Sequence, residues 1–185
     1  MGQTSDAEFK CRKCGKVVPF EQYTLNRFCP DCGTLLPRRQ LKQWMFQFNP
    51  AIYRWFDRTK ENRETEQWLT SRYAKDIQEG DKVAIWASGE KAGVYATGVI
   101  LTDPSKKPLN PEQEKYYTNK EDISKFREKC SVTVKYLKVI VDRPLRVDEC
   151  NKDPILSEMA VLKQPQSTNF RLTKKQWNRI LELMD

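Results

Sequence analysis

A pair of C-x-x-C motifs near the start of the chain restricts its fold more than any other feature. Cys11 and Cys14 form the first pair, Cys29 and Cys32 form the second, and fourteen residues separate the pairs. A glycine follows the second cysteine of each pair, and glycine permits the tight turn that points backbone amides at the sulfur atoms. Four thiolates at this spacing are typical of a closed tetrahedral zinc site. We therefore predict one Zn²⁺ per chain with all four cysteines as ligands.

The predicted metal is structural, because a closed site of four cysteines has no open coordination position for a substrate. The alternatives are two disulfides, free thiols or an iron–sulfur centre, and disulfides are rare in cytosolic proteins. The first nine residues, MGQTSDAEF, lack the apolar stretch of a secretory signal. The sequence also has no apolar run of about 18 residues. We therefore expect a cytoplasmic protein that has no membrane segment.

The remaining composition argues against catalysis. The chain contains no histidine, which excludes Ser-His-Asp and Cys-His sites and removes the commonest general base. The segment DRTKENRETE alternates carboxylates with arginine and lysine, as a solvated helix face does, and this pattern disfavours a metal-dependent nuclease site. Cys130 and Cys150 have no C-x-x-C partner, so we interpret them as small buried residues. We predict that the protein is not an enzyme.

The chain is basic, with a formal net charge of +8. This charge has two interpretations, an ordinary solvated surface or a surface that attracts a polyanion such as nucleic acid. Basic and acidic residues are interleaved, so charge alone does not decide between them. The candidates for phosphate contacts are Arg72, Lys91 and Lys174.

Short strands with helices between them are indicated after the cysteine motifs. WMFQFNP alternates so that Trp44, Phe46 and Phe48 share one face. IWASGEKAGVYATG predicts a hairpin whose glycines mark a close approach of another backbone. SVTVKYLKVIV is the longest β-like run, and its alternation changes phase near Tyr136 and Leu137, which indicates either a bulge or a strand buried on both faces.

Helical patterns are shorter and fewer. Thr173 and Gln176 form a capping box at the start of a C-terminal helix, and Trp177 lies on its apolar face. TSRYAKDIQEGD predicts a second short helix, and residues 103–130 read as a long polar loop with at most one short helix. Trp44 and Trp177 are assigned to the core. Five or six strands with short helices predict an α+β fold with a strongly bent mixed sheet or small barrel.

Four segments in this order resemble the successive motifs of the EVE domain, a PUA-like family related to YTH domains. They are WMFQFNP, WLTSRY, IQEGDKVAIWASGEKAGVYATGVI and LKQPQSTNFRLTKKQW. The resemblance implies a PUA-like mixed β-barrel of about six strands over residues 41–184. The cysteine segment, residues 8–37, resembles a zinc ribbon. One departure from the family pattern is Ser167, which stands where glycine is common.

The resemblance further implies a pocket that holds a modified base of DNA or RNA between aromatic rings. Carried over by position, its ligand-binding residues are Asn49, Trp68, Thr70, Trp86, Ser88 and Thr168. The resemblance also implies that the hairpin of residues 85–98 forms the pocket floor. Stacking contributes about 1–3 kcal/mol per base, so an aromatic wall would supply most of the affinity.

The predicted function is therefore a non-catalytic reader of a modified base, with nucleic acid as its partner. The alternative is a zinc-ribbon RNA-binding or translation-associated module that does not distinguish modified bases. Whether the zinc ribbon contacts nucleic acid or a protein partner stays open at this point.

Overall fold

The structure is a computed structural model that describes residues 8–11, 13–19, 28–34, 41–61 and 63–185. Contacts divide the chain into two compact units, Met1–Leu41 and Lys42–Asp185, which are described separately below. Within the expected zinc ribbon, residues 12, 20–27 and 35–37 lie outside the described residues. In the described part of the chain, no helix is long and apolar enough to cross a membrane.

The N-terminal unit contains one small antiparallel hairpin. Strand β1 (Glu8–Lys10) pairs with β2 (Val17–Pro19). Its described core is minimal, consisting of Cys11, Val18 and Cys29 with Cys32 packed against them. So small an apolar core supplies little burial energy, and such modules usually rely on a metal for their stability.

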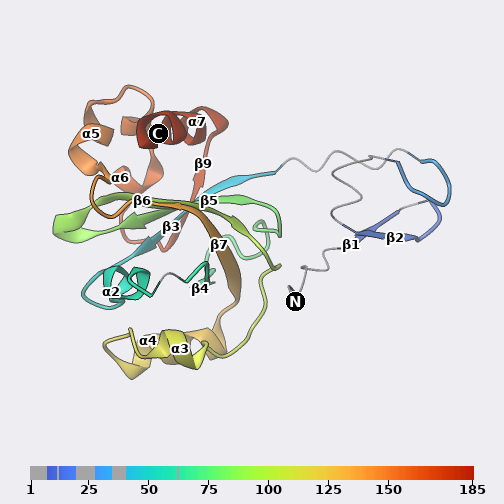
Figure 1. The fold of residues 1–185 in the computed structure, drawn as a ribbon, viewed down its shortest axis with the longest axis horizontal. Coiled ribbons are helices and arrows are strands. Elements are labelled where there is room, and N and C mark those ends of the chain that lie inside the picture. Colours follow the sequence, from blue (N-terminus) through green and yellow to red (C-terminus); the bar gives the residue numbers. More distant parts are fainter. Residues whose placement is uncertain (1–7, 12, 20–27, 35–40, 62) are drawn as a thin grey trace. The chain divides into compact units, whose positions relative to one another are not determined.

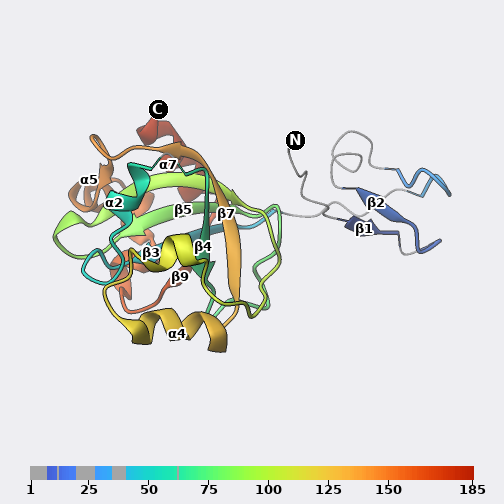
Figure 2. The same cartoon turned by 60° about the horizontal axis from the view of Figure 1, so that its bottom comes forward.

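The C-terminal unit is built on one mixed sheet that curls into a half-barrel (Figure 1 and Figure 2). Six strands follow the order β4-β7-β6-β5-β3-β9, and β8 pairs with β6 beside them. Strand β3 pairs with β5 in parallel and with β9 in antiparallel orientation. This arrangement confirms the predicted α+β fold. The strands are β3 (Gln43–Phe48), β4 (Thr65–Leu69), β5 (Lys82–Ala87), β6 (Gly93–Ile100), β7 (Ser131–Val139), β8 (Leu145–Arg146) and β9 (Asn169–Leu172).

Short helices occupy the connections between strands. Helix α7 begins with the predicted capping box, in which the Gln176 amide donates to Thr173 Oγ1 and the Thr173 amide donates to Gln176 Oε1. The helices are α2 (Trp55–Thr59), α3 (Pro111–Glu114), α4 (Lys120–Glu128), α5 (Val147–Lys152), α6 (Ala160–Lys163) and α7 (Lys174–Met184), with 3₁₀ turns η1 (Gly89–Lys91) and η2 (Leu156–Glu158).

Two local predictions were wrong. The segment that follows β4, expected to form a helix over residues 70–80, consists of turns, and the polar stretch 103–130, expected to contain at most one short helix, contains both α3 and α4. Helix α4 is capped by Asn119, whose side chain accepts from the Asp122 amide at 2.8 Å. The buried residue of α4 is Phe126, whose side chain is fully inaccessible to solvent. One buried ring in nine residues leaves little apolar periodicity for a sequence pattern to reveal.

Alternation along the strands divides the buried side chains between the two faces of the sheet. Trp44, Phe46 and Phe48 point into the inner core, which also contains Trp55 and Trp68. Met45 and Trp86 point to the opposite face, where α7 contributes Trp177 and Ile180. The assignment of Trp44 and Trp177 to the core is confirmed, since both are buried.

The glycines of the central hairpin lie where a neighbouring strand comes close. A Cβ atom on Gly98 would lie 2.4 Å from the Lys135 carbonyl oxygen, and one on Gly93 would lie 2.6 Å from that of Leu145. Strands β7 and β8 are therefore the backbones that approach this hairpin. Opposite Gly98, the register shifts so that Leu137 is an extra residue in β7, which confirms the predicted bulge.

Candidate functional site

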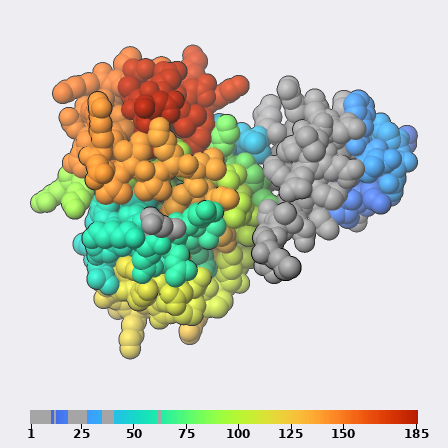
Figure 3. Space-filling view, viewed as in Figure 1, coloured from blue at the N-terminus to red at the C-terminus, as the bar shows by residue number. Residues whose placement is uncertain are grey.

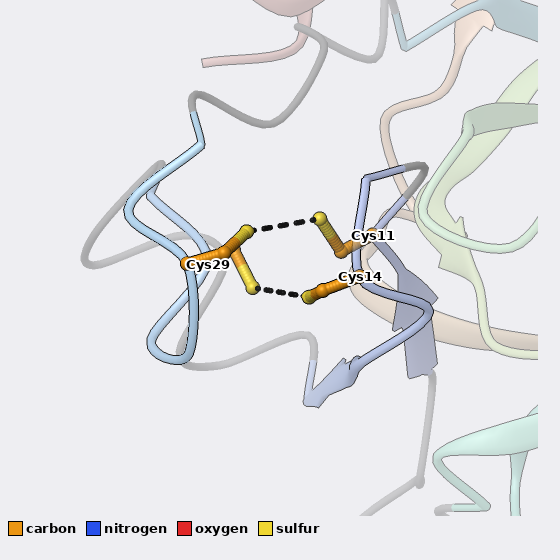
Figure 4. Close-up of side chains that lie close together, drawn as sticks. Cys11, Cys14 and Cys29 are labelled. Carbon is orange, nitrogen blue, oxygen red and sulfur yellow. Dashed lines mark hydrogen bonds between the residues drawn. The ribbon is translucent and has the colours of Figure 1, made fainter.

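The four cysteine thiols of the N-terminal unit converge on one point. Their Sγ atoms all lie within 4.8 Å of one another, with Cys11 and Cys32 at 3.7 Å and Cys14 and Cys29 at 3.5 Å (Figure 4). Two matching turns produce this arrangement, because the Gly15 amide donates to the Cys11 carbonyl and the Gly33 amide to the Cys29 carbonyl, each at 2.9 Å. Both glycines have positive φ, 75° and 64°, a conformation that glycine adopts without strain.

This geometry fits a tetrahedral metal ion. A Zn–S bond of about 2.3 Å places the corners of a tetrahedron about 3.8 Å apart, close to the two shorter sulfur separations. Hydrogen bonds with the Thr34 side chain and backbone lower the pKa of Cys32 to about 6. For Cys14, a hydrogen bond with the Lys16 backbone is outweighed by burial and by hydrogen bonds with the other three cysteines, which instead raise its pKa to about 12. The Cys11 pKa is lowered by the backbone amides of Cys14 and Lys13. These four residues could hold one ion, and all four coordination positions would be filled by sulfur.

The C-terminal unit contains a second candidate site, a pocket of about 220 Å³ at the end of β3 and β4. We call it the aromatic pocket. Its lining comes from five separate segments, which are the end of β3, the loop before α2, the end of β4, helix α4 with the loop that precedes it, and the loop before β9. The lining residues are Gln47, Phe48, Asn49, Ile52, Tyr53, Trp68, Leu69, Tyr117, Asp122, Lys125, Gln166, Ser167 and Thr168.

Aromatic rings form one side of the aromatic pocket. Tyr53 and Tyr117 stack with centroids 4.6 Å apart and planes 18° apart. Trp68 meets Tyr53 edge to face at 6.2 Å and is only 6% exposed. Burial, followed by the charge of Glu66, raises the pKa of Tyr117 far above its usual value, so this phenol stays protonated. The pocket thus offers flat apolar surface with a neutral hydroxyl.

Asn49 supplies a directed polar group at the mouth of the aromatic pocket. Its Oδ1 accepts a hydrogen bond from the Ala51 amide at 2.9 Å, and this bond fixes the orientation of the side-chain amide. Among the described residues, Nδ2 has no protein partner and remains available as a donor. Thr168 lies nearby on the loop before β9, and its Oγ1 is 2.8 Å from the Oγ of Ser71, which follows β4.

A buried carboxylate supports the aromatic wall from behind. Glu66 accepts from the Tyr53 hydroxyl at 2.5 Å and from Trp55 Nε1 at 3.1 Å, and it pairs with Arg58 Nε at 2.6 Å. The Tyr136 hydroxyl also bonds to it. Burial raises the pKa of Glu66, while the donated hydrogen bonds and the Arg58 guanidinium oppose that rise. This network holds the wall residues in place.

The structure brings together three of the six residues that the resemblance implied as ligand contacts, Asn49, Trp68 and Thr168, and it does not bring the other three into the aromatic pocket. Thr70 is buried, and its hydroxyl donates to the Cys130 carbonyl at 3.0 Å. Ser88 donates to the Phe48 carbonyl behind the pocket. Trp86 lies on the opposite face of the sheet. The expected hairpin floor is absent as well, since none of residues 85–98 is among the lining residues.

Sequence reasoning missed the residues that complete the aromatic pocket from distant segments. Tyr117 and Asp122 come from the stretch interpreted as a polar loop, and Gln166 precedes the motif residue Thr168. A signal was available for α4, because Asn119 followed by Asp122 is an N-cap pattern. For Tyr117 no local signal exists, since a single tyrosine in a polar stretch has no periodicity.

The family of this chain follows from a comparison with family models. The model described as the EVE domain matches residues 42–183. The chain belongs to the EVE domain family. A search of curated proteins found no significant match.

Solved structures share this EVE fold at low sequence identity. A hypothetical protein from Leishmania major has a TM-score of 0.58 and 18% identity, covering 79% of this chain and 96% of its own. A protein from Rhodopseudomonas palustris has a TM-score of 0.57 and 15% identity, covering 77% and 92%. Human THYN1 protein, in complex with DNA that contains 5-methylcytosine, has a TM-score of 0.55 and 16% identity, covering 78% and 98%. At these identities the similarity establishes the fold.

Proposed function

We propose that this EVE domain protein is a non-catalytic reader that holds one modified base of a nucleic acid in the aromatic pocket. The observation that carries the proposal is the composition of the pocket, a flat aromatic surface beside an oriented amide donor and a threonine hydroxyl. A base taken out of its stack needs both, because its faces stack on rings and its edge forms hydrogen bonds.

The size of the aromatic pocket supports a single base as the ligand. Its volume of about 220 Å³ lies below the range of about 300–1,000 Å³ that is common for small-molecule and cofactor sites. In our proposal, Trp68 is part of the wall, Asn49 donates to the base edge from Nδ2, and Thr168 contacts the ligand from the opposite loop. Thr70, Trp86 and Ser88 act by supporting the surrounding structure.

Membership in the EVE family and the fold shared with human THYN1 protein guide the choice of ligand. That protein was solved with DNA containing 5-methylcytosine, so methylated DNA is the first ligand to test here. In this proposal the residues that bind DNA come from the EVE domain, over residues 41–184, and a zinc ribbon over residues 8–37 holds one structural Zn²⁺ through its four cysteines.

The test is a binding screen with paired oligonucleotides that differ only in one modified base. We expect the full chain to bind DNA with 5-methylcytosine, or another modified base in a DNA or RNA panel, more tightly than the unmodified twin. Burial of one methyl group contributes about 0.8 kcal/mol, so discrimination of about fourfold is the minimum expected. Equal affinity for every modified and unmodified pair would contradict the proposal.

Asn49→Asp makes the same test specific to the pocket. The aspartate keeps an oxygen for the Ala51 amide, so the turn stays intact, but it replaces the Nδ2 donor by a negatively charged acceptor. We expect binding of the preferred oligonucleotide to weaken by about 1–3 kcal/mol, the cost of an unsatisfied polar contact. Thr118→Ala is the matched control, because its hydroxyl donates to the same turn at the Ala51 carbonyl but lies outside the pocket lining.

The second candidate function is a zinc-ribbon module that binds RNA without regard to modification. The observation in favour of this candidate is that the cysteine cluster belongs to a compact unit of its own, Met1–Leu41. The same screen separates the two candidates. Binding that is retained by residues 1–41 and is indifferent to modification would favour the zinc ribbon as the reader of nucleic acid.

A further inference from the structure

A long groove lies beside α2 and shares no lining residue with the aromatic pocket. It consists of two adjoining hollows of about 570 Å³ and 560 Å³ that share Phe56, Lys60, Val141 and Asp142. We call this surface the basic groove. In Figure 3 it follows the junction between the teal surface of α2 and the orange surface of the segment from β7 to α5. Seven basic and four acidic residues line it.

Three of the four acidic residues are already engaged by the protein. Glu66 is paired with the buried Arg58, and Glu64 lies 3.5 Å from Lys135 Nζ. Glu149 Oε2 accepts from the Arg146 amide at 2.9 Å, which caps α5. Four of the seven basic residues are paired with carboxylates as well, namely Arg58, Lys60, Arg63 and Lys138. Lys91, Arg143 and Arg146 remain, with Asp142 as the acidic residue beside them, and they give that end of the groove a positive surface, which by charge complementarity favours a polyanion.

Several of these cations are held in position. The Arg146 guanidinium donates from Nη1 to the Tyr95 hydroxyl at 2.8 Å and from Nη2 to the Glu90 carbonyl at 2.7 Å. Lys91 Nζ lies 4.9 Å from the centre of the Phe56 ring. A guanidinium that is already oriented loses little conformational entropy when it binds an anion. Arg143, on the same rim, is exposed and has no protein partner in the described part of the chain.

The basic groove and the aromatic pocket are separated by one layer of side chains. Phe48 lines the pocket and Phe56 lines the groove, and their rings are 5.7 Å apart. Trp68 of the pocket donates through Nε1 to the hydroxyl of Tyr136, which lines the groove, at 3.1 Å. The two hollows therefore lie close together, on either side of a single layer of rings.

We propose that the basic groove binds the sugar–phosphate backbone next to the base held in the aromatic pocket. This inference rests on the proposed function. It assigns binding of the phosphates to the groove and recognition of the base to the pocket. The pocket lining has one acidic and one basic residue, Asp122 and Lys125, which form a hydrogen-bonded ion pair, so its own charge attracts no phosphate. Affinity that depends on salt would come from the groove, and recognition of the base would come from the pocket.

The groove also has an apolar strip, Leu137, Val139 and Val141, whose side chains are 69%, 42% and 41% exposed. Such a strip is a common feature of protein interfaces. The cations on both sides of it favour the nucleic-acid backbone as the occupant. A protein partner, including a second copy of this chain, is the alternative that the experiment must expose.

The experiment compares two double charge reversals with the same change in net charge. Lys91→Glu with Arg143→Glu alters the groove, and Lys106→Glu with Lys175→Glu alters exposed lysines that line neither hollow. The probe is a labelled DNA oligonucleotide with one central 5-methylcytosine, together with its unmethylated twin, titrated over a salt series.

We expect the groove variant to bind both oligonucleotides about tenfold to a hundredfold more weakly at about 50 mM salt, with its salt slope reduced by about 1.4 for two lost contacts to a single strand. The preference for the methylated oligonucleotide should persist, because the pocket is unchanged. The control variant should bind within about threefold of the wild type.

Equal losses in both variants would overturn the proposal, since net charge alone would then explain them. An unchanged affinity of the groove variant, with the methyl preference intact, would contradict backbone binding by the groove but would not contradict the proposed function. A groove effect without any methyl preference would support the groove and contradict the proposed function. Self-association that is abolished by Leu137→Glu, with DNA binding unaffected, would assign the groove to a protein partner and overturn the proposal.

Discussion

Trp68 Nε1 donates a hydrogen bond to the Tyr136 hydroxyl at 3.1 Å, and this bond joins the aromatic pocket to the buried network behind it. The same hydroxyl accepts from Trp55 Nε1 at 3.0 Å and bonds to the Glu66 carboxylate. Burial and the Glu66 charge raise the pKa of Tyr136 well above its usual value, so the phenol remains a donor to the carboxylate. The pocket wall is therefore fixed by strands β4 and β7 together.

Tyr136→Phe should destabilise the C-terminal unit and loosen the pocket wall. The substitution keeps the ring but leaves the Trp68 indole N–H without an acceptor, and a buried unsatisfied polar group costs about 1–3 kcal/mol. Urea unfolding at constant pH measures this loss, with unfolding followed by tryptophan fluorescence. The matched control is Tyr73→Phe, which removes a hydroxyl that has no hydrogen bond within the described part of the chain. A Tyr136→Phe protein as stable as the wild type would show that the bond does not hold the wall.

Trp68 contributes both to the inner core and to the pocket wall, so the effects of its truncation on binding and on stability must be measured separately. Trp68→Ala should weaken binding of the preferred oligonucleotide by about 1–3 kcal/mol through lost stacking, and it should cost about 3–5 kcal/mol of stability through the cavity that it leaves. Trp68→Phe keeps a ring and is expected to fold. Both variants should keep the salt slope of binding, because that slope counts phosphate contacts. Undiminished affinity in a folded Trp68→Ala protein would exclude this ring from the site.

The sequence predicted the elements that depend on local patterns. The cysteine turns require Gly15 and Gly33 at fixed spacing, the capping box requires Thr173 and Gln176, and the bulge at Leu137 interrupts an alternation that is visible in one strand. Each of these features is encoded within a few neighbouring residues. The predicted fold class followed from them and from the EVE resemblance.

The positions of side chains relative to distant strands were harder to predict. Trp86 was expected in the pocket, yet Ile85 pairs with Phe46 and shares the inner core with it, so the next residue must point to the other face. Assigning Trp86 to a face thus requires the register between β3 and β5, which no local pattern specifies. The same holds for Tyr117, which reaches the pocket only because its ring stacks on Tyr53 from a distant segment.

Cys29→Ser should release zinc and unfold the N-terminal unit while the C-terminal unit stays folded. The reason is that the described core of the N-terminal unit consists almost entirely of cysteine ligands, whereas the C-terminal unit has separate cores. Metal analysis of purified protein and hydrogen exchange of each unit measure the two effects. Cys130→Ser is the control, since this cysteine lies outside the cluster, and it should retain one zinc per chain. Full zinc occupancy in Cys29→Ser would refute the four-cysteine assignment.

Asp153 gives the C-terminal unit a predictable dependence on pH. Its side chain accepts from Arg179 Nε at 2.7 Å and from the amides of Ile155 and Leu156, and the Arg179 hydrogen bond, followed by those amides, lowers its pKa. A carboxyl with a depressed folded-state pKa stabilises the fold above its unfolded pKa of about 3.9 and loses that contribution as the pH falls through the folded value.

Asp153→Asn should therefore be less stable than the wild type at pH 7, and the difference should shrink as the pH falls from 7 through the lowered folded-state pKa of Asp153. The asparagine keeps an oxygen for the two amides, so the change isolates the charge. Thermal unfolding of both proteins across this pH range measures the difference. Glu182→Gln removes the other, exposed partner of Arg179 and should have little effect, because exposed ion pairs contribute little to stability. A stability difference that stays constant until the wild type unfolds in acid would show that Asp153 acts through its shape and not through its charge.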